Sequence, residues 1–564
     1  MDYMERYRFW CEAELPEDVR QELATMKNNV EELKGSFGSE LQFGTAGMRG
    51  IMGVGSNRLN RYTVRRAAQG MAAWLVSAGL PLKAAIGYDS RHNSRLFAQV
   101  CAIAFAERGI HTYLYDRLAP TPMLSYAVRE LGCGCGIVIS ASHNAGAYNG
   151  VKCYGPDGCQ MTDGPAAIVT EKINAIPYFV PEKKSFDVFM EEGLITYIGQ
   201  ELWEKYYQTV LAEAVDPEMI RSAGLDIVYT PLCGTGNEPV REILGRLGVN
   251  ITVVSCQEKP DGDFKTCEYP NPETDAALYE SYKVARSAPC DVILGTDPDA
   301  DRVAIAVPYG EGFQKLSGNE LGCLLLDYIL KERCARNDIP DGAITVRSIV
   351  SSPLADQIAK RYGVTMKAVL TGFKYIGGEI LELEKKNEQD KFVFGFEESC
   401  GYLKGTYARD KDAVVASMLI CEMAANLKKQ GKTILDALDE MYTTYGHYLA
   451  YVQSVELTGA DAMEKAAKMM ADLRAVVPGS IGGVKVTGVR DYHASVDRDL
   501  LSGQEKMIQL PKSNVLEFLL GESGSVIVRP SGTEPKVKFY YTAVAADEAS
   551  AKSLLKSMVA QMSK

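Results

Sequence analysis

Three aspartates spaced two residues apart stand out as candidates for metal chemistry. Asp297, Asp299 and Asp301 lie in GTDPDADR, directly after the apolar run VIL. In an extended backbone, residues two apart point the same way, so three carboxylates would converge and repel one another. A hard divalent cation removes that conflict, and oxygen ligands favour Mg²⁺. The motif therefore predicts a magnesium site at the end of a strand.

Two alternatives compete for this acidic motif. A calcium-binding EF-hand loop fails, because Arg302 stands where the loop needs glycine and Pro308 where it needs a bidentate glutamate. A solvated acidic turn is the other alternative. The apolar run VAIAV that follows the motif favours the strand-end site over such a turn.

A second motif, SASHNAGAYNGVK, carries a serine among small residues at the end of the apolar run CGIVIS. Ser142 could act as a nucleophile, or it could cap a helix. A hydrolase triad is not indicated, because no Asp–His partner is evident and the chain lacks a GxSxG elbow. The residues alone leave nucleophile and cap open.

Three later loops could bind a phosphorylated ligand. GSVIVRPSGTEPKVKFYY offers Arg529, Ser531, Gly532 and Thr533, which suit a phosphate dianion, although such a turn is often only a hairpin. FGFEESCGY places Glu397 and Ser399 at a strand end, where they could bind sugar hydroxyls. LTGFKYIGG adds Lys374 beside glycines. Each of these loops is a weak signal by itself.

Alternating apolar strands and helices must position these loops. Runs such as AAIGYD, HTYLYD and CGIVISAS alternate with helical segments such as SRLFAQVCAIAFAERG, and the rhythm restarts near residues 200 and 311. We expect α/β architecture with three similar α/β domains and mixed sheets, followed by a smaller α+β domain. The expected domains are 1–200, with a helical N-terminal extension, 201–310, 311–445 and 446–564.

Composition narrows the function classes. The 564 residues carry a net charge of −12 without a basic block, which disfavours nucleic acid and anionic membranes as partners. The 14 cysteines include no CxxC pair, so we interpret them as reduced thiols of a cytoplasmic protein. The N-terminus lacks an apolar signal core, and no apolar run is long enough to span a membrane.

Taken together, the loops resemble those of the α-D-phosphohexomutase family, which includes phosphoglucomutases and phosphomannomutases. The motifs FGTAGMRG, SASHNAGAYNGVK, GTDPDADR, TGFKYIG, GFEESCGY and RPSGTEPK occur in the family's order, from about residue 40 to the end. The residues of these motifs are most similar to those of the bacterial phosphoglucomutases and the eukaryotic phosphoglucomutase/phosphopentomutase-like branch.

The resemblance implies four domains around a central cleft and a phosphoserine at Ser142. It implies Mg²⁺ held by Asp297, Asp299, Asp301 and an oxygen on Ser142, with a glucose 1,6-bisphosphate intermediate. Positive charge near the transferred group would come from Arg49, Arg302 and Lys152. The implied proton-transfer candidates are His143, Lys152 and Lys374. The implied substrate-binding residues are Thr371, Gly372, Glu397, Ser399, Arg529, Ser531, Gly532, Thr533 and Arg302.

Three positions depart from common family patterns. Ala145 replaces a proline after His-Asn, Cys233 replaces a frequent histidine, and Tyr402 stands where some members carry histidine. The last two put in doubt any sugar contact or proton transfer assigned to those positions. No metal ligand is lost, and the serine is present.

The resemblance predicts an enzyme that interconverts glucose 1-phosphate and glucose 6-phosphate, acting as a monomer or dimer on small sugar phosphates. Mannose, pentose or glucosamine phosphates are alternative substrates, because a site that binds the intermediate in two orientations must be tolerant. A non-catalytic sugar-phosphate-binding paralogue and a phosphatase are alternatives of other classes. The first predicts loss of the serine or an aspartate, and all of them are present.

Overall fold

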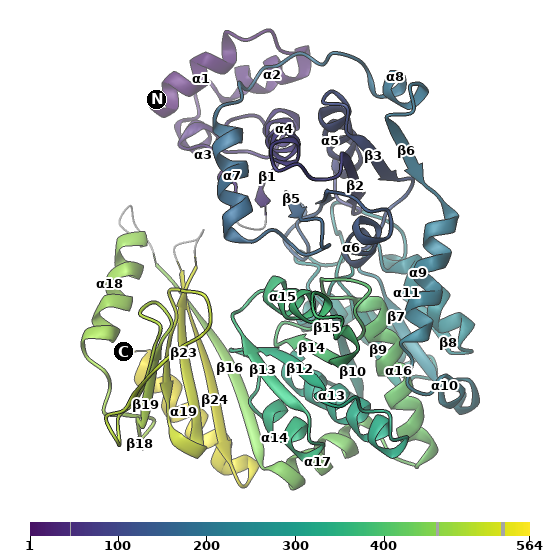
Figure 1. Ribbon diagram of the computed structural model, residues 1–564, viewed down its shortest axis with the longest axis vertical. Coiled ribbons are helices and arrows are strands. Elements are labelled where there is room, and N and C mark those ends of the chain that lie inside the picture. The colour runs from purple at the N-terminus through teal and green to yellow at the C-terminus, as the bar shows by residue number, and fades with distance from the viewer. Residues whose placement is uncertain (45–46, 458–461, 532–535, 564) are drawn as a thin grey trace. The chain divides into compact units, whose positions relative to one another are not determined.

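The N-terminal part of the chain builds a mixed six-stranded sheet in the order β1-β5-β4-β2-β3-β6 (Figure 1). The computed structural model describes residues 1–44, 47–457, 462–531 and 536–563. Strand β2 pairs in parallel with β3 and β4, whereas β5 runs antiparallel to both β4 and β1. The strands are β1 (Gly47–Ile51), β2 (Lys83–Tyr88), β3 (His111–Tyr115), β4 (Cys135–Ile139), β5 (Tyr148–Tyr154) and β6 (Ile195–Ile198).

Helices cover both faces of this sheet. Ile86 and Ile137 join one core with residues of α4 and α5, which lie side by side (Figure 1). On the other face, α6 approaches so closely that a Cβ at Gly136 would lie 2.5 Å from Cγ2 of Val128. The helices are α4 (Arg61–Ser77), α5 (Ser94–Ala106), α6 (Thr121–Glu130), α7 (Asp163–Asn174) and α8 (Phe186–Glu191).

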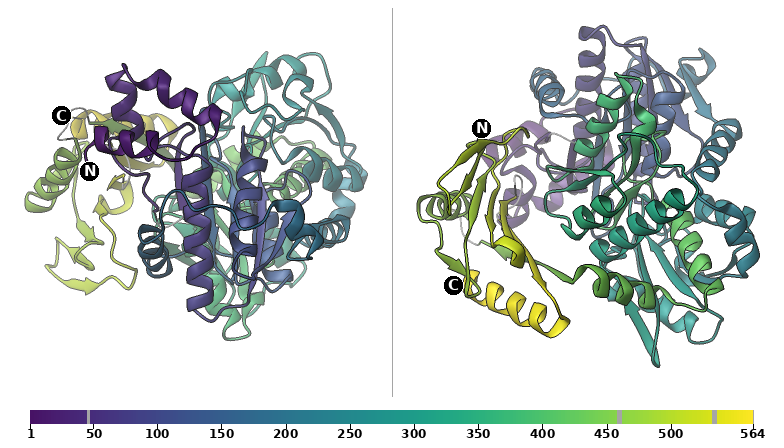
Figure 2. Two further views of the ribbon diagram at one scale, coloured as in Figure 1. Left: turned by 90° about the horizontal axis from the view of Figure 1, so that it is seen from above. Right: turned by 60° about the horizontal axis from the view of Figure 1, so that its bottom comes forward.

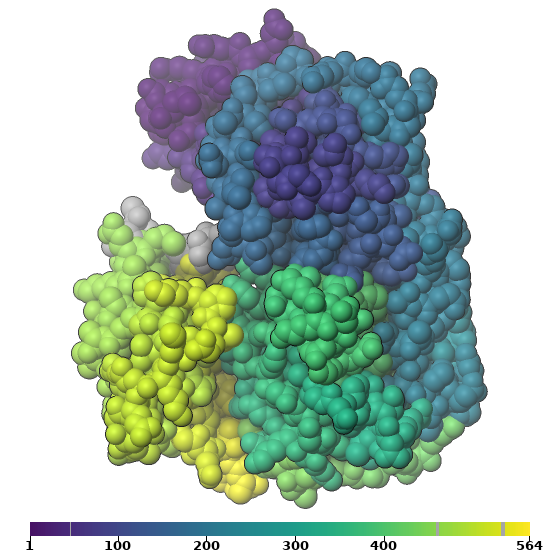
Figure 3. Space-filling view, in the orientation of Figure 1, coloured from purple at the N-terminus to yellow at the C-terminus, as the bar shows by residue number. Residues whose placement is uncertain are grey.

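Three short helices precede this sheet and form a hydrophobic core with nearby residues of the first sheet domain. Trp10 is almost fully buried and packs its ring edge-on against Phe37, Tyr62 and Phe179. These aromatic contacts attach the extension to the first sheet domain, and Figure 3 shows it in purple at the surface. The helices are α1 (Tyr3–Cys11), α2 (Glu17–Met26) and α3 (Val30–Phe37).

A second sheet of five strands follows in the order β11-β10-β9-β7-β8. Parallel β8, β7 and β9 continue into an antiparallel hairpin of β9, β10 and β11. Its strands are β7 (Asp226–Thr230), β8 (Asn250–Val253), β9 (Val292–Thr296), β10 (Val303–Tyr309) and β11 (Gly312–Lys315). The accompanying helices are α9 (Gln200–Ala212), α10 (Pro217–Ala223), α11 (Asn237–Arg246), α12 (Asp275–Ala285) and, from much later in the chain, α16 (Ala413–Lys429).

The described chain divides into two compact units. The first comprises Met1–Gly318, Ile376–Gly395 and Ser399–Gly431, and so contains both sheets above. The second comprises Asn319–Tyr375, Phe396–Glu398 and Lys432–Lys564, of which residues 458–461, 532–535 and 564 lie outside the description.

The third α/β stretch supplies elements to both units. Strand β12 pairs in parallel with β13 in the second unit. The elements of this stretch are α13 (Gly318–Ala335), β12 (Ile344–Ser348), α14 (Leu354–Arg361), β13 (Thr365–Val369), α15 (Phe373–Glu384), β14 (Phe392–Glu397), β15 (Gly401–Leu403) and α17 (Ile434–Tyr445).

The C-terminal part is a seven-stranded sheet in the order β16-β24-β23-β22-β19-β20-β21. On one face, Val528 and Phe539 form a core with α18 and α19, and Figure 2 shows α19 in yellow lying along the sheet. On the other face, Ile527 and Tyr540 pack with Leu370 of the third stretch. The main elements are β16 (His447–Glu456), α18 (Ala462–Ala475), β19 (Gly488–Asp491), β20 (Val496–Asp499), β21 (Glu505–Met507), β22 (Leu516–Leu519), β23 (Gly524–Pro530), β24 (Lys536–Ala545) and α19 (Glu548–Met562).

Among the described residues, no helix combines the length and apolar character needed to cross a membrane.

Candidate active site

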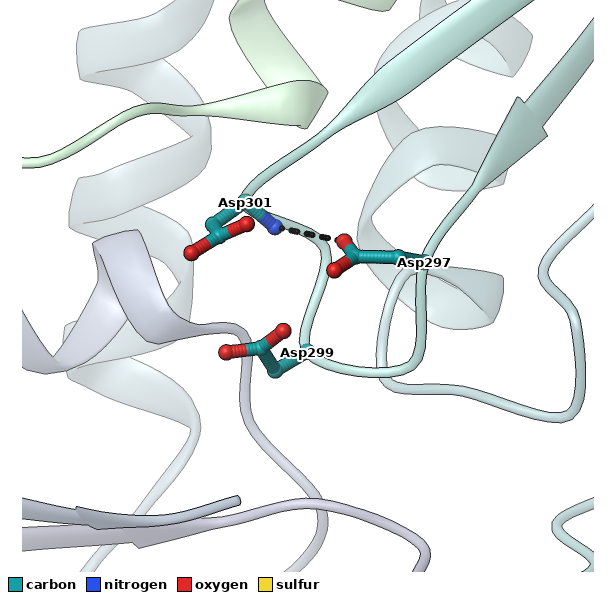
Figure 4. A group of neighbouring side chains, drawn as sticks. All are labelled: Asp297, Asp299 and Asp301. Atoms are coloured by element: carbon teal, nitrogen blue, oxygen red, sulfur yellow. Dashed lines mark hydrogen bonds between the residues drawn. The ribbon is translucent and has the colours of Figure 1, made fainter. Parts of the chain in front are cut away.

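The three aspartates lie on the turn between β9 and β10 and point toward one another (Figure 4). All three are buried, and one oxygen from each lies within 4.8 Å of the others. The expectation of an extended backbone through these three residues is wrong. Oδ1 of Asp297 instead accepts the N–H groups of Asp301 and Arg302, at 3.1 and 3.0 Å, and Ala300 has a φ of 51°. The carboxylates converge because the chain folds back on itself in a turn. They do not converge because alternate residues of a strand point the same way.

Neighbouring segments hold this turn from outside. The Thr235 N–H donates to the Pro298 carbonyl at 2.8 Å, and the Thr121 N–H donates to the Asp299 carbonyl at 2.9 Å. Beside Thr235, a Cβ at Gly234 would lie 2.4 Å from Cα of Pro298, so only glycine allows this approach. These contacts to its backbone therefore fix the turn together with the hydrogen bonds that Asp297 accepts.

The acidic turn fits a divalent cation. Oδ1 of Asp299 and Oδ1 of Asp301 are buried and accept no hydrogen bond from the described residues, a costly state for carboxylate oxygens unless something positive binds them. Desolvation by burial, followed by the charges of Asp299 and Asp301, raises the pKa of Asp297 well above its usual range. Three hard oxygen donors in this state could hold a metal ion, and the donor type suits Mg²⁺.

Two buried lysines share the acidic turn. Nζ of Lys152 donates to Asp299 at 2.5 Å and to Asp301 at 3.1 Å, and Nζ of Lys411 lies 3.2 Å from Asp301. Burial alone would lower the pKa of Lys152, but Asp299 and Asp301 outweigh it and raise the pKa. Burial alone would raise the pKa of Asp301, but Lys152 and then Lys411 outweigh it and lower the pKa. Lysine and aspartate side chains of opposite charge are therefore in direct contact within this site.

Ser142 faces the acidic turn. Its Oγ donates to Oδ2 of Asp297 at 2.6 Å and lies 3.2 Å from Nδ1 of His143. The residue has a φ of 52°, and its N–H donates to Oγ of Ser140 at 2.8 Å. A turn and then β5 follow, so Ser142 does not cap a helix. Its hydroxyl is aimed at the carboxylates.

Basic groups surround the serine loop. Nη1 of Arg49, on β1, donates to the Asn144 side chain at 3.0 Å. Burial, and then the charges of Arg302 and Arg49, lower the pKa of His143 well below its usual range, so its ring is neutral at pH 7. Arg302 itself pairs with Glu273 at 2.8 Å. Burial alone would lower the pKa of Arg302, but Glu273, Asp301 and Asp297 together outweigh it and raise the pKa.

Several residues that contribute to this site were not identified from the sequence. Arg91, Thr121, Glu273 and Lys411 all contact the predicted serine or acidic loops. The available signal was GYDSRHNS, a polar segment that directly follows a buried strand as the other site loops do. Buried charges that bind backbone carbonyls look like ordinary surface residues in a sequence.

The second unit contains another group of predicted residues. Oε1 of Glu397 accepts the Gly372 N–H at 2.7 Å, and Oγ1 of the neighbouring Thr371 is buried without a hydrogen-bond partner in the described part of the chain. Tyr540 interacts with Arg529. Burial, and then Glu398, raise the pKa of Tyr540 to about 12, although Arg529 acts in the opposite direction.

The other predicted residues are placed as follows. Lys374 lies over the ring of Tyr375, with Nζ 5.1 Å from the ring centroid. Ser531 follows β23, and Ser399, in the first unit, lies in the turn between β14 and β15. Gly532 and Thr533 lie outside the described residues.

Comparison with known proteins now identifies the family. Models of the phosphoglucomutase/phosphomannomutase alpha/beta/alpha domains I, II and III match residues 40–178, 204–310 and 317–445, and the model of the C-terminal domain matches 459–561. The chain belongs to the phosphoglucomutase/phosphomannomutase family. This confirms the resemblance seen in the motifs and the architecture of three α/β domains with a C-terminal domain.

Individual relatives agree over nearly the full length. A phosphoglucomutase of Staphylococcus epidermidis is 36% identical over 512 residues, covering 90% of this chain and 92% of the relative. One from Staphylococcus haemolyticus is 37% identical over 507 residues, covering 89% and 90%. The crystal structure of pp63/parafusin, a phosphoglucomutase from Paramecium, shares the fold with a TM-score of 0.68 at 16% identity, covering 93% of this chain and 94% of that one.

Proposed function

We propose that this enzyme is an intramolecular phosphotransferase that interconverts glucose 1-phosphate and glucose 6-phosphate through a phosphoserine at Ser142. The observation that carries the proposal is the 2.6 Å contact between Oγ of Ser142 and Asp297, beside carboxylate oxygens that accept no hydrogen bond from any residue that the structure describes. A hydroxyl beside a cation-ready acidic turn suits phosphoryl transfer. The full-length similarity to phosphoglucomutases supports glucose phosphates as the substrates.

The proposed reaction has two balanced halves. The phosphoryl group leaves Oγ of Ser142 for a free hydroxyl of the sugar monophosphate, that hydroxyl's proton moves to a base, and the released Oγ of Ser142 takes up a proton. The resulting glucose 1,6-bisphosphate reverses its orientation in the site. Its other phosphoryl group then returns to Oγ of Ser142, which gives up its proton, and the released sugar oxygen takes a proton. His143, Lys152 and Lys374 are the candidates for holding the proton, and the neutral ring of His143 beside Oγ makes it available as an acceptor.

The acidic turn and its basic neighbours would stabilise the transferred group. Asp297, Asp299 and Asp301, with an oxygen on Ser142, would hold Mg²⁺. The bound ion would supply charge neutralisation to the phosphoryl oxygens. Arg49, Arg302 and Lys152 are proposed to add positive charge in the same place.

The remaining predicted residues would bind the sugar phosphate. Glu397, Ser399, Thr371 and Gly372 are proposed to contact sugar hydroxyls and Arg529, Ser531, Gly532 and Thr533 the phosphate that is not reacting. The hydroxyl of Thr371, which is buried and has no hydrogen-bond partner among the described residues, supports a polar ligand in the second unit. We further propose the domain division 1–200, 201–310, 311–445 and 446–564, and a cytoplasmic enzyme that acts as a monomer or dimer.

A substrate panel tests this function. The purified protein is incubated with Mg²⁺, a trace of glucose 1,6-bisphosphate and the 1-phosphates of glucose, mannose, ribose and glucosamine in separate reactions. We expect the highest kcat/KM for glucose 1-phosphate and loss of turnover in Ser142→Ala. A higher kcat/KM for mannose or ribose 1-phosphate would contradict the assigned sugar. Release of inorganic phosphate at the rate of substrate loss would indicate a phosphatase, and near-full turnover of S142A would contradict the nucleophile.

A further inference from the structure

The guanidinium of Arg91 lies beneath the serine loop and binds its backbone. Nη2 donates to the carbonyl oxygens of Ser142 and Asn144, at 2.6 and 2.5 Å, and Nη1 donates to those of Ala145 and Tyr148, at 2.9 and 3.0 Å. The side chain of Arg91 is fully buried. An arginine is almost never fully buried unless it is paired, and this one directs four hydrogen bonds to the backbone of one short loop.

The remaining contacts of Arg91 fix its orientation. Its Nε lies 3.3 Å from Oδ2 of Asp89, whose side chain is also fully buried. Oδ1 of Asp89 accepts hydrogen bonds from the backbone N–H of Arg91 and from the Ser94 hydroxyl, at 3.0 and 2.8 Å. Phe264 lies against the guanidinium, with its ring centroid 4.9 Å away. Nη1 and Nη2 thus each donate to two loop carbonyls, whereas Nε forms an ion pair with Asp89 but no hydrogen bond within the described part of the chain. The four hydrogen bonds and the ion pair together restrict the orientation of the guanidinium.

The loop needs such a restraint at Ser142. A φ of 52° at a non-glycine residue is strained and persists only where the surroundings enforce it. Arg91 holds the carbonyl of Ser142 itself, while the hydroxyl of Ser140 holds its N–H. Restraining the peptide groups on both sides of Ser142 determines where its Cβ and Oγ point.

We infer that Arg91 is a positioning residue, which directs Oγ of Ser142 toward the acidic turn by holding the loop carbonyls. Arg91 forms no hydrogen bond or ion pair with the carboxylates of that turn among the described residues, although its charge interacts with those of Asp299 and Asp297. Its side-chain hydrogen bonds are with the loop. The inference rests on the proposed phosphoserine function. Its consequence is that weakening the restraint slows phosphoryl transfer while leaving sugar-phosphate binding and the acidic turn intact.

Arg91→Lys tests the inference, because an ammonium keeps the charge but has three donors and cannot serve four spread carbonyls. We expect kcat to fall about 10- to 100-fold, the size of effect that a misplaced reacting group produces. KM for glucose 1-phosphate should stay within about threefold, since positioning acts on the transferred group. The single-turnover rate of Ser142 phosphorylation by glucose 1,6-bisphosphate should fall by the same factor as kcat, and thermal stabilisation by Mg²⁺ should persist.

Arg65→Lys is the matched control. Arg65 is also a buried arginine of the first domain, paired with Glu107 at 2.8 Å, but it does not contact the serine loop. We expect R65K to lose thermal stability while keeping kcat per folded molecule. Equal losses of kcat in R91K and R65K, or wild-type kcat in R91K, would overturn the inference.

Asp89→Asn provides a second test if R91K does not fold. The asparagine amide keeps the oxygen that accepts the backbone N–H of Arg91, but it removes the negative charge that pairs with the guanidinium. We expect a smaller fall in kcat, about 3- to 10-fold, again with little change in KM. An unchanged kcat in D89N would also count against the inference. The wild-type chain is assayed alongside: absent wild-type turnover contradicts the proposed function, whereas equal turnover in wild type and variants contradicts the positioning role alone.

Discussion

Replacing Asp297 with asparagine separates the charge of the acidic turn from its hydrogen bonds. Oδ1 of Asp297 accepts the N–H groups of Asp301 and Arg302, and an amide oxygen can accept both. Oδ2 accepts the Ser142 hydroxyl, and an amide nitrogen can donate to that hydroxyl instead. Asp297→Asn therefore keeps three contacts and removes one negative charge from a site that, in the proposed function, holds a cation.

The structure sets the size of the effect. The three carboxylates lie within 4.8 Å of one another. At that distance, two like charges repel by about 3.5 kcal/mol in an effective dielectric of about 20. Lys152 and Lys411 already offset much of the charge on Asp299 and Asp301. We therefore expect D297N to raise the free energy of unfolding of the metal-free protein by about 1–2 kcal/mol, a Tm increase of a few degrees.

Magnesium should reverse this order. A ligand present at about 100 times its Kd adds about 2.7 kcal/mol to the stability of the state that binds it. The wild type should gain that stability, whereas D297N, which has lost an anionic ligand, should not. The Tm of both proteins is measured by calorimetry in EDTA and in excess Mg²⁺.

Asp412→Asn is the control for this experiment. Asp412 is another buried aspartate, but it accepts hydrogen bonds from the hydroxyls of Tyr206 and Tyr407, at 2.8 and 2.6 Å, and does not belong to the acidic group. We expect D412N to lose stability without magnesium and to keep the Mg²⁺-dependent rise in Tm. A metal-free D297N that melts below the wild type, or one that is stabilised by Mg²⁺ as the wild type is, would refute the reasoning.

Three further substitutions test other parts of the account. Gly234→Ala places a Cβ 2.4 Å from the Pro298 backbone and should raise the Mg²⁺ concentration needed for half-maximal activity about tenfold or more. Gly245→Ala, whose Cβ meets nothing within 4 Å, should leave that concentration unchanged. Equal Mg²⁺ titrations of the two variants would contradict the packing argument. Arg529→Ala should raise KM for glucose 1-phosphate about 10- to 100-fold in steady-state kinetics, and an unchanged KM would remove Arg529 from the phosphate site. Trp10→Ala should cost about 3–5 kcal/mol of unfolding free energy in denaturant melts without changing kcat per folded molecule, so a melt like the wild type's would disprove the role of the aromatic core.

The sequence predicted the architecture well because its apolar runs have clear lengths and boundaries. AAIGYD and CGIVIS become β2 and β4, and the helical segment between them becomes α5. These strands are buried on both faces, so they read as continuous apolar runs rather than alternating ones. Glycines within them let α6 approach, which the sequence did not indicate.

The site was predictable where its residues follow strands, as Ser142 and the three aspartates do. The local geometry was not predictable, because nothing in an alanine side chain signals the φ of 51° at Ala300 that closes the acidic turn. Arg91 was missed because its partners are backbone carbonyls, which every residue carries. Buried charge can be recognised only when the fold shows what surrounds it.

The most direct test of the account is to locate the transferred phosphoryl group. The purified enzyme is incubated with glucose 1,6-bisphosphate and Mg²⁺, denatured, digested and analysed by peptide mass spectrometry. We predict one phosphoryl group on Ser142, which is lost on addition of excess glucose 1-phosphate and is absent from Ser142→Ala. Stoichiometric phosphate on another residue, or turnover by an enzyme whose Ser142 never becomes phosphorylated, would contradict the account.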